Sequence, residues 1–138
     1  MNDRSMLRRG TARVLPAILV VLIGATAVQV GLAGASAFGA SAWGMHTMLG
    51  GLIALLATIS LVACVAAGMG REVIAASTIT LVLVVLQPVL AVMAQRTSPW
   101  FGLLHAADAL LLFTLLAWAA WTTLGRRRSD RLATVPAA

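Results

Sequence analysis

Four long apolar stretches dominate the chain, and short segments that are polar or rich in small residues separate them. Their approximate limits are residues 14–35, 43–69, 73–94 and 100–124. Each stretch supplies the roughly 20 apolar residues that a helix needs to cross the hydrocarbon core of a bilayer. The pattern therefore predicts an all-α protein, a bundle of four transmembrane helices joined by short loops.

Charge predicts the orientation of this bundle. The ten basic residues are all arginine, and eight of them lie in tails at residues 1–13 and 125–138, which flank a transmembrane domain at residues 14–124. Basic residues beside spans concentrate on the cytoplasmic side, so we expect both termini in the cytoplasm. The first apolar stretch is longer than a signal-peptide core, and three further spans follow it, so we interpret it as a retained helix.

Composition agrees with a lipid environment. Hydrophobic residues make up 61% of the chain and charged residues only 10%, a balance that excludes a water-soluble domain. The arginines flank spans instead of clustering on one folded surface beside base-reading side chains, so we expect no nucleic-acid partner. Arginine without lysine and abundant alanine are typical of a GC-rich bacterium, and we assign the chain to the bacterial cytoplasmic (inner) membrane as a multi-pass protein.

The two halves of the chain repeat the same landmarks at nearly the same offset. The pairs are Trp43 and Trp100 (57 positions apart), Gln29 and Gln87 (58), and His46 and His105 (59). Each half would hold two spans, so the halves would share one membrane orientation and be related by an axis along the membrane normal. The repeat predicts two tandem helical hairpins.

The two histidines are the main candidates for a metal site. Each follows an interfacial tryptophan by a few residues, so His46 and His105 are predicted at similar depth on two parallel helices. Two neutral imidazoles can act as axial ligands of one haem iron. Gly50 and Gly51 would let the porphyrin approach a backbone, and Arg96 is the cation placed to meet the propionates. Packing between helices and substrate contact are the alternatives for these rings.

Asp108 is the second candidate, because an acid inside a span is costly and is usually paired or functional. It could orient a ligand, bind a quinone headgroup or relay protons, and the structural alternative is a hydrogen bond to Gln29 or Thr26. Gln87 is expected to satisfy the backbone where Pro88 kinks the third span.

The segments around the histidines resemble a known class of membrane protein. HTMLG at residues 46–50 and LHAADAL at residues 104–110 are similar to the haem-bearing helices of haem A synthase halves, cytochrome b561-type proteins and small four-span bacterial membrane proteins of unknown function. The resemblance implies a four-helix cytochrome b module. The cytochrome b561 pattern uses four histidines for two haems, and this chain has two, which limits it to one bis-histidine haem b.

Two functions from different classes follow. The first is a b-type cytochrome that binds one haem near the outer leaflet and transfers electrons with a quinone or a respiratory-complex subunit. The alternative is a non-enzymatic accessory or assembly subunit of a larger membrane complex, in which the histidines only pack. A transporter ranks third because few polar residues could line a pore. Whether the protein is an enzyme, and whether it forms a homo-oligomer, stays open.

Overall fold

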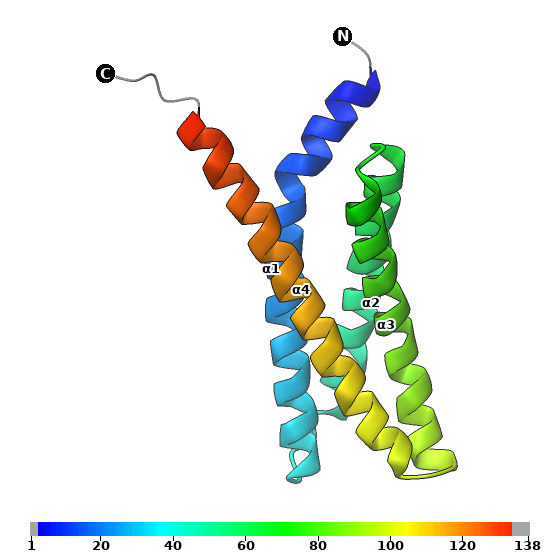
Figure 1. Cartoon of the computed structure of the whole chain (residues 1–138). Helices are drawn as coiled ribbons and strands as arrows, with labels where there is room; N and C mark the ends of the chain where they lie inside the picture. The colour runs from blue at the N-terminus through cyan, green and yellow to red at the C-terminus, as the bar shows by residue number, and fades with distance from the viewer. Residues whose placement is uncertain (1–2, 134–138) are drawn as a thin grey trace.

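The computed structural model describes residues 3–133, which form four antiparallel helices (Figure 1). The helices are α1 (Asp3–Ala37), α2 (Trp43–Ala66), α3 (Arg71–Arg96) and α4 (Trp100–Ala133). Both ends of the described chain lie at one end of the bundle, here called the terminal end, together with the α2–α3 loop. The α1–α2 and α3–α4 loops lie at the opposite end, here called the loop end.

The predicted four-helix fold is confirmed: each of the four helices is long and apolar enough to cross a membrane. The outer two helices run beyond the predicted spans, because α1 begins at Asp3 and α4 continues to Ala133. Much of both basic tails is therefore helical. Of the second tail, residues 134–138 lie outside the described part of the chain.

Glycines end the first two helices in the same way. Gly39 and Gly68 have positive φ angles of 94° and 59°, a conformation that glycine adopts without the steric cost that other residues incur. After Gly68, the Met69 N–H donates to the carbonyl oxygen of Cys64 at 3.0 Å, which closes a Schellman turn. This turn is why α2 ends at Ala66, three residues before the predicted end of the span.

The helices are arranged as a ring in which each one packs against two neighbours. α1 packs against α2 and α4, and α3 packs against the same two helices. Within the described residues, the α-carbons of α2 and α4 nowhere approach within 8 Å, and the same holds for α1 and α3. The two histidine-bearing helices therefore lie diagonally across the bundle.

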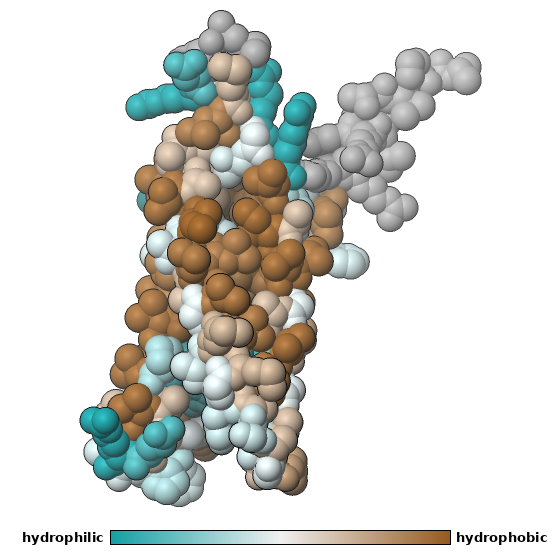
Figure 2. Space-filling model, turned by 180° about the vertical axis from the view of Figure 1, so that it is seen from behind, coloured by the Kyte–Doolittle hydropathy of each residue, from teal (hydrophilic) through white to brown (hydrophobic). Residues whose placement is uncertain are grey.

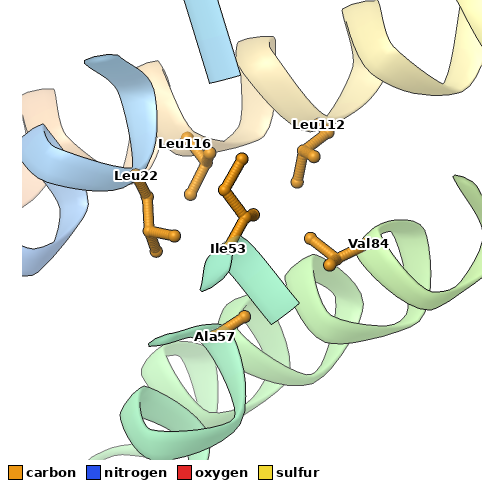
Figure 3. Packing of buried hydrophobic residues seen from close by; sticks show 6 residues of the cluster. All are labelled: Leu22, Ile53, Ala57, Val84, Leu112 and Leu116. Carbon is orange, nitrogen blue, oxygen red and sulfur yellow. The ribbon is translucent and has the colours of Figure 1, made fainter. Parts of the chain in front are cut away.

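A small apolar core fills the middle of this ring (Figure 3). The cluster comprises Leu22, Ile53, Ala57, Val84, Leu112 and Leu116. Ile53 and Leu112 are 59 positions apart, and so are Ala57 and Leu116. The core thus repeats at the offset of the histidines, which supports the predicted pair of tandem hairpins.

The outer surface is apolar over most of its height, as Figure 2 shows for one face. Large hydrophobic side chains are exposed on every helix, for example Val20, Leu55, Val82 and Leu111. A soluble monomer rarely exposes so large an apolar area. The exposed apolar belt and the polar ends are those of a protein embedded in a lipid bilayer.

Pro16 and Pro88 both lie inside helices. Pro16 lies well beyond the first turn of α1, because this helix begins thirteen residues earlier, at Asp3. An interior proline removes one backbone hydrogen bond and bends a helix. Accordingly, the blue N-terminal part of α1 leans away from the axis of the rest of the helix (Figure 1).

Candidate functional site: a glutamine–histidine layer

Both histidines lie close to the loop end and face the interior of the bundle. His46 is the fourth residue of α2, and His105 is the sixth residue of α4. Seven residues make two helical turns, so His46 lies on the same face as Ile53, and His105 lies on the same face as Leu112. Ile53 and Leu112 belong to one core cluster. Both imidazoles are therefore directed inward and are partly buried.

In the first hairpin, Gln29 of α1 and His46 of α2 exchange two hydrogen bonds. The Gln29 side-chain Nε2 donates to the His46 carbonyl oxygen at 2.8 Å, and His46 Nδ1 lies 3.1 Å from the Gln29 carbonyl oxygen. A carbonyl oxygen only accepts hydrogen bonds. His46 Nδ1 must therefore carry the proton, and in the neutral ring Nε2 is left as an unprotonated nitrogen.

The second hairpin repeats this exchange between α3 and α4. Gln87 Nε2 donates to the His105 carbonyl oxygen at 3.1 Å, and His105 Nδ1 lies 3.0 Å from the Gln87 carbonyl oxygen. The same reasoning fixes the proton of the neutral His105 ring on Nδ1. We call these two sets of bonds the glutamine–histidine exchanges.

Neither histidine Nε2 has a hydrogen-bond partner among the residues that the structure describes. The ring of His46 is further held by Trp43, whose ring meets it edge-on with centroids 5.6 Å apart. Each imidazole is therefore fixed by one nitrogen and offers the other. This is the arrangement of a metal-binding histidine, in which the non-ligating N–H bonds to a carbonyl or carboxylate.

Asp108 joins the second exchange. Its side chain is buried, with 5% of its surface exposed, and its Oδ2 accepts a hydrogen bond from Gln87 Nε2 at 2.5 Å. The two N–H groups of one amide thus serve the His105 carbonyl and the Asp108 carboxyl. Gln29 and Thr26 were the wrong partners for Asp108: Gln29 bonds to α2, and the Thr26 hydroxyl donates to the Leu22 carbonyl of its own helix.

The two glycines proposed as a porphyrin cradle have different surroundings. A Cβ added at Gly50 would lie 3.0 Å from Gln29 Nε2, so the glycine makes room for the amide of the first exchange. Gly51 is exposed and has nothing within 4 Å of such a Cβ. Arg96 is the last residue of α3 and is exposed at the loop end, the end where the histidines lie.

The glutamines are the site residues that sequence reasoning missed. Gln29 and Gln87 were recognised as repeat landmarks, but Gln87 was expected to satisfy the α3 backbone around Pro88, and its amide bonds to α4 instead. The available signal was the similar spacing in the two halves: Gln29 precedes His46 by 17 residues, and Gln87 precedes His105 by 18. The other amide atom of the first exchange, Gln29 Oε1, is buried and has no hydrogen-bond partner.

Comparison with known protein families gives a match over part of the chain. Residues 29–95 match the profile of a family of unknown function, DUF6220. The matched segment begins at Gln29 and covers α2 and nearly all of α3, so it contains the whole first exchange and Gln87 but ends before His105 and Asp108. No curated protein and no solved structure matches the chain.

Proposed function

We propose that this protein is a small membrane b-type cytochrome that binds one haem b through His46 and His105. The observation that carries the proposal is the pair of Nδ1-to-carbonyl hydrogen bonds, at 3.1 and 3.0 Å, which leave two Nε2 atoms available on inward faces of the bundle. Both hairpins fix the same histidine tautomer, which is the tautomer that two ligands of one iron need.

The position of the two helices supports a shared ligand. A haem shared by His46 and His105 would lie between α2 and α4 and would take one imidazole from each helix. The two helices must then stand apart by the length of both side chains and of the haem between them. α2 and α4 meet this condition because they are diagonal in the ring.

The chemistry of the donor set also suits haem. Zinc and copper sites usually take three or four protein ligands, and no group of three or more His, Cys, Asp or Glu side chains occurs among the described residues. Haem iron needs only two ligands from the protein, because the porphyrin occupies the other positions. A bound haem supplies one-electron chemistry.

Four residues close to the histidines have supporting roles in this proposal. Gln29 and Gln87 are positioning residues, since their carbonyl oxygens orient the two imidazoles. Asp108 places a carboxyl group close to His105, and Arg96 is the cation for a propionate. The arginine distribution favours the outer leaflet for the loop end, so a quinol, an oxygen species or a respiratory-complex subunit would meet the haem from the outer side.

One observation favours a second function. The same exchanges tie α1 to α2 and α3 to α4 without any ligand, and interhelical hydrogen bonds of this kind stabilise membrane bundles. A non-enzymatic accessory or assembly subunit could use them for folding alone. The two functions differ in whether His46 and His105 Nε2 bind iron.

Histidine substitutions in protein expressed with a haem supply test the proposal. His46→Ala and His105→Ala should each convert a six-coordinate low-spin spectrum to high spin or abolish haem binding. His46→Gln is the matched control for folding, because an amide N–H can still donate toward the Gln29 carbonyl while the imidazole ligand is lost. It should stay folded and lose the low-spin spectrum.

Two results would overturn the proposal. One is a purified wild-type protein that is folded and colourless after expression with excess haem. The other is an unchanged haem spectrum in both alanine variants. In either case, reduced helix content or early unfolding of the alanine variants would assign the exchanges to folding alone.

A further inference from the structure

A cavity of about 250 Å³ lies between the helices in the half of the bundle nearer the terminal end. All four helices contribute to its wall, and on α2 the lining starts at Ala57, eleven residues beyond His46. At 1.5 Å per residue this is about 16 Å along the helix, so the cavity is separate from the histidine layer. Figure 1 shows α4 leaning away from the α2–α3 hairpin in this half.

The wall is mostly apolar, with several hydroxyl groups. The hydroxyls belong to Ser60, Ser77, Thr80, Thr122 and Thr123. Thr122 and Thr123 donate to the Ala119 carbonyl of their own helix, and Ser77 donates to the Cys64 sulfur at 3.8 Å. The hydrogens of these three groups are thus already used within the protein.

Ser60 is different. Only 6% of the residue is exposed, and its Oγ is buried with no hydrogen-bond partner. A helical serine or threonine commonly donates to the carbonyl four residues earlier, as Thr58 does to Ala54 at 2.8 Å on the same helix. A buried hydroxyl without a partner is destabilising. Because Ser60 lines the cavity, an oxygen atom of a bound ligand would supply the hydrogen-bond partner that its hydroxyl lacks.

We propose that this cavity binds the ring of a neutral, lipid-soluble carbonyl compound of the quinone class, with Ser60 donating a hydrogen bond to a ring carbonyl. The apolar wall disfavours a charged ligand, and Glu72, which also lines the cavity, gives no attraction for an anion. Pockets for drug-sized ligands measure about 300–1,000 Å³. This smaller, partly open cavity fits a ring and leaves an apolar tail in the membrane.

Trp118 lines the cavity and gives a direct readout. In a variant with Trp43, Trp100 and Trp121 replaced by Phe, Trp118 is the remaining tryptophan, and quinone rings quench tryptophan fluorescence. Menadione, a naphthoquinone without a tail, should quench it saturably in detergent micelles. Quenching that rises linearly with menadione, as partitioning into the micelle alone would produce, would overturn the proposal.

Two adjacent alanines of α3 give a matched pair of variants. Ala76 lines the cavity, whereas Ala75 is exposed on the lipid side. Ala76→Phe should fill the cavity and abolish saturable quenching, and Ala75→Phe should leave it unchanged. Equal loss in both variants, or equal retention in both folded variants, would contradict the location.

Ser60→Ala tests the hydrogen bond without filling the cavity. Loss of one hydrogen bond to a neutral acceptor should weaken menadione binding by about 3- to 10-fold. Methylnaphthalene, which has the ring but no carbonyl, should displace menadione, and its own affinity should not fall in the variant. An unchanged menadione affinity would contradict the hydrogen bond from Ser60 and would show that the cavity binds apolar rings without selecting for a carbonyl group. These measurements do not require bound haem. A negative result would contradict the quinone site and would leave the cytochrome proposal unaffected.

Discussion

The two hairpins build the same glutamine–histidine exchange, yet their surroundings differ at two equivalent positions. At the histidine offset of 59 residues, Asp108 of the second hairpin corresponds to Leu49 of the first, and Ala109 corresponds to Gly50. In the second hairpin the glutamine amide serves two acceptors, the His105 carbonyl and Asp108. In the first it serves one, and its oxygen is left buried without a partner.

The features that both hairpins share and the features found in only one of them have different roles. The shared part, a carbonyl oxygen that fixes a histidine tautomer, is what two equal axial ligands need. The unshared part is Asp108, which places a carboxyl group in the second hairpin only. A ligand bound between His46 and His105 would therefore have different electrostatic surroundings on its two sides. We expect variants of the shared part to act alike in both hairpins and variants of the unshared part to act in one.

The largest expected effect concerns the α1–α2 and α3–α4 loops, which should be fully accessible to reagents outside the cell. With Cys64 replaced by Ala, single cysteines at Ser41 and Ser98 should both react with an impermeant thiol reagent added outside intact cells. A cysteine at Gly70, in the α2–α3 loop, should react only after permeabilisation. Ser41 and Ser98 labelled from opposite sides would break the tandem-hairpin arrangement, and both labelled only from inside would reverse the predicted orientation.

Substitution of the two glutamines should have unequal effects on stability. Gln87→Leu removes two hydrogen bonds and leaves the buried Asp108 without its donor, which should lower the free energy of unfolding by about 3 kcal/mol. Gln29→Leu removes one hydrogen bond together with an unpartnered oxygen, and it should cost only about 0.6 kcal/mol. Reversible unfolding in mixed micelles measures both values.

A double variant shows whether Asp108 causes the inequality. In Gln87→Leu/Asp108→Leu, both members of the pair become apolar, and most of the lost stability should return. Equal losses in the two single glutamine variants, or no recovery in the double variant, would contradict the role assigned to Asp108.

Gly50 and Gly51 form the next comparison. A leucine at Gly50 must displace the Gln29 amide, because even a Cβ would lie 3.0 Å from Nε2. We expect a loss of about 1–3 kcal/mol and weaker haem binding through His46. Gly51→Leu places the same side chain on an exposed surface and should change stability little. If the two variants unfold alike, the close approach of Gln29 to α2 is not present.

Asp108→Asn should have a small effect on stability. The asparagine oxygen can still accept the hydrogen bond from Gln87, so we expect a change below about 1 kcal/mol. Haem should still bind, and its midpoint potential should shift because the acid near one axial ligand is gone. Redox titration followed in the visible spectrum measures the shift, and an unchanged potential would separate Asp108 from the haem.

Sequence patterns were sufficient for the fold because the bilayer imposes it. A span of about 20 apolar residues leaves a helix as the way to satisfy the backbone, and the landmark offsets place His46 and His105 at related positions. The helix ends were less predictable: tail residues carry too much charge to be read as span, yet they continue α1 and α4.

The partners within the layer could not be predicted, for a physical reason. The helices are apolar nearly all round, so their sequences define no strong inward face. The rotation of each helix about its axis is then fixed by a few polar contacts, which the sequence does not reveal. For this reason the sequence suggested Gln29 or Thr26 as the partner of Asp108, and the structure shows Gln87. The terminal-end cavity depends on the inclination of α4, which no local pattern encodes.

The most direct test of the central claim is the electron paramagnetic resonance spectrum of the oxidised wild-type protein, quantified per chain. If the two exchanges present His46 and His105 to one iron, the spectrum should show low-spin ferric haem with two imidazole ligands, at one haem per chain. A high-spin ferric signal, a signal from mixed histidine–methionine ligation, or no haem signal from folded protein supplied with haem would contradict the account.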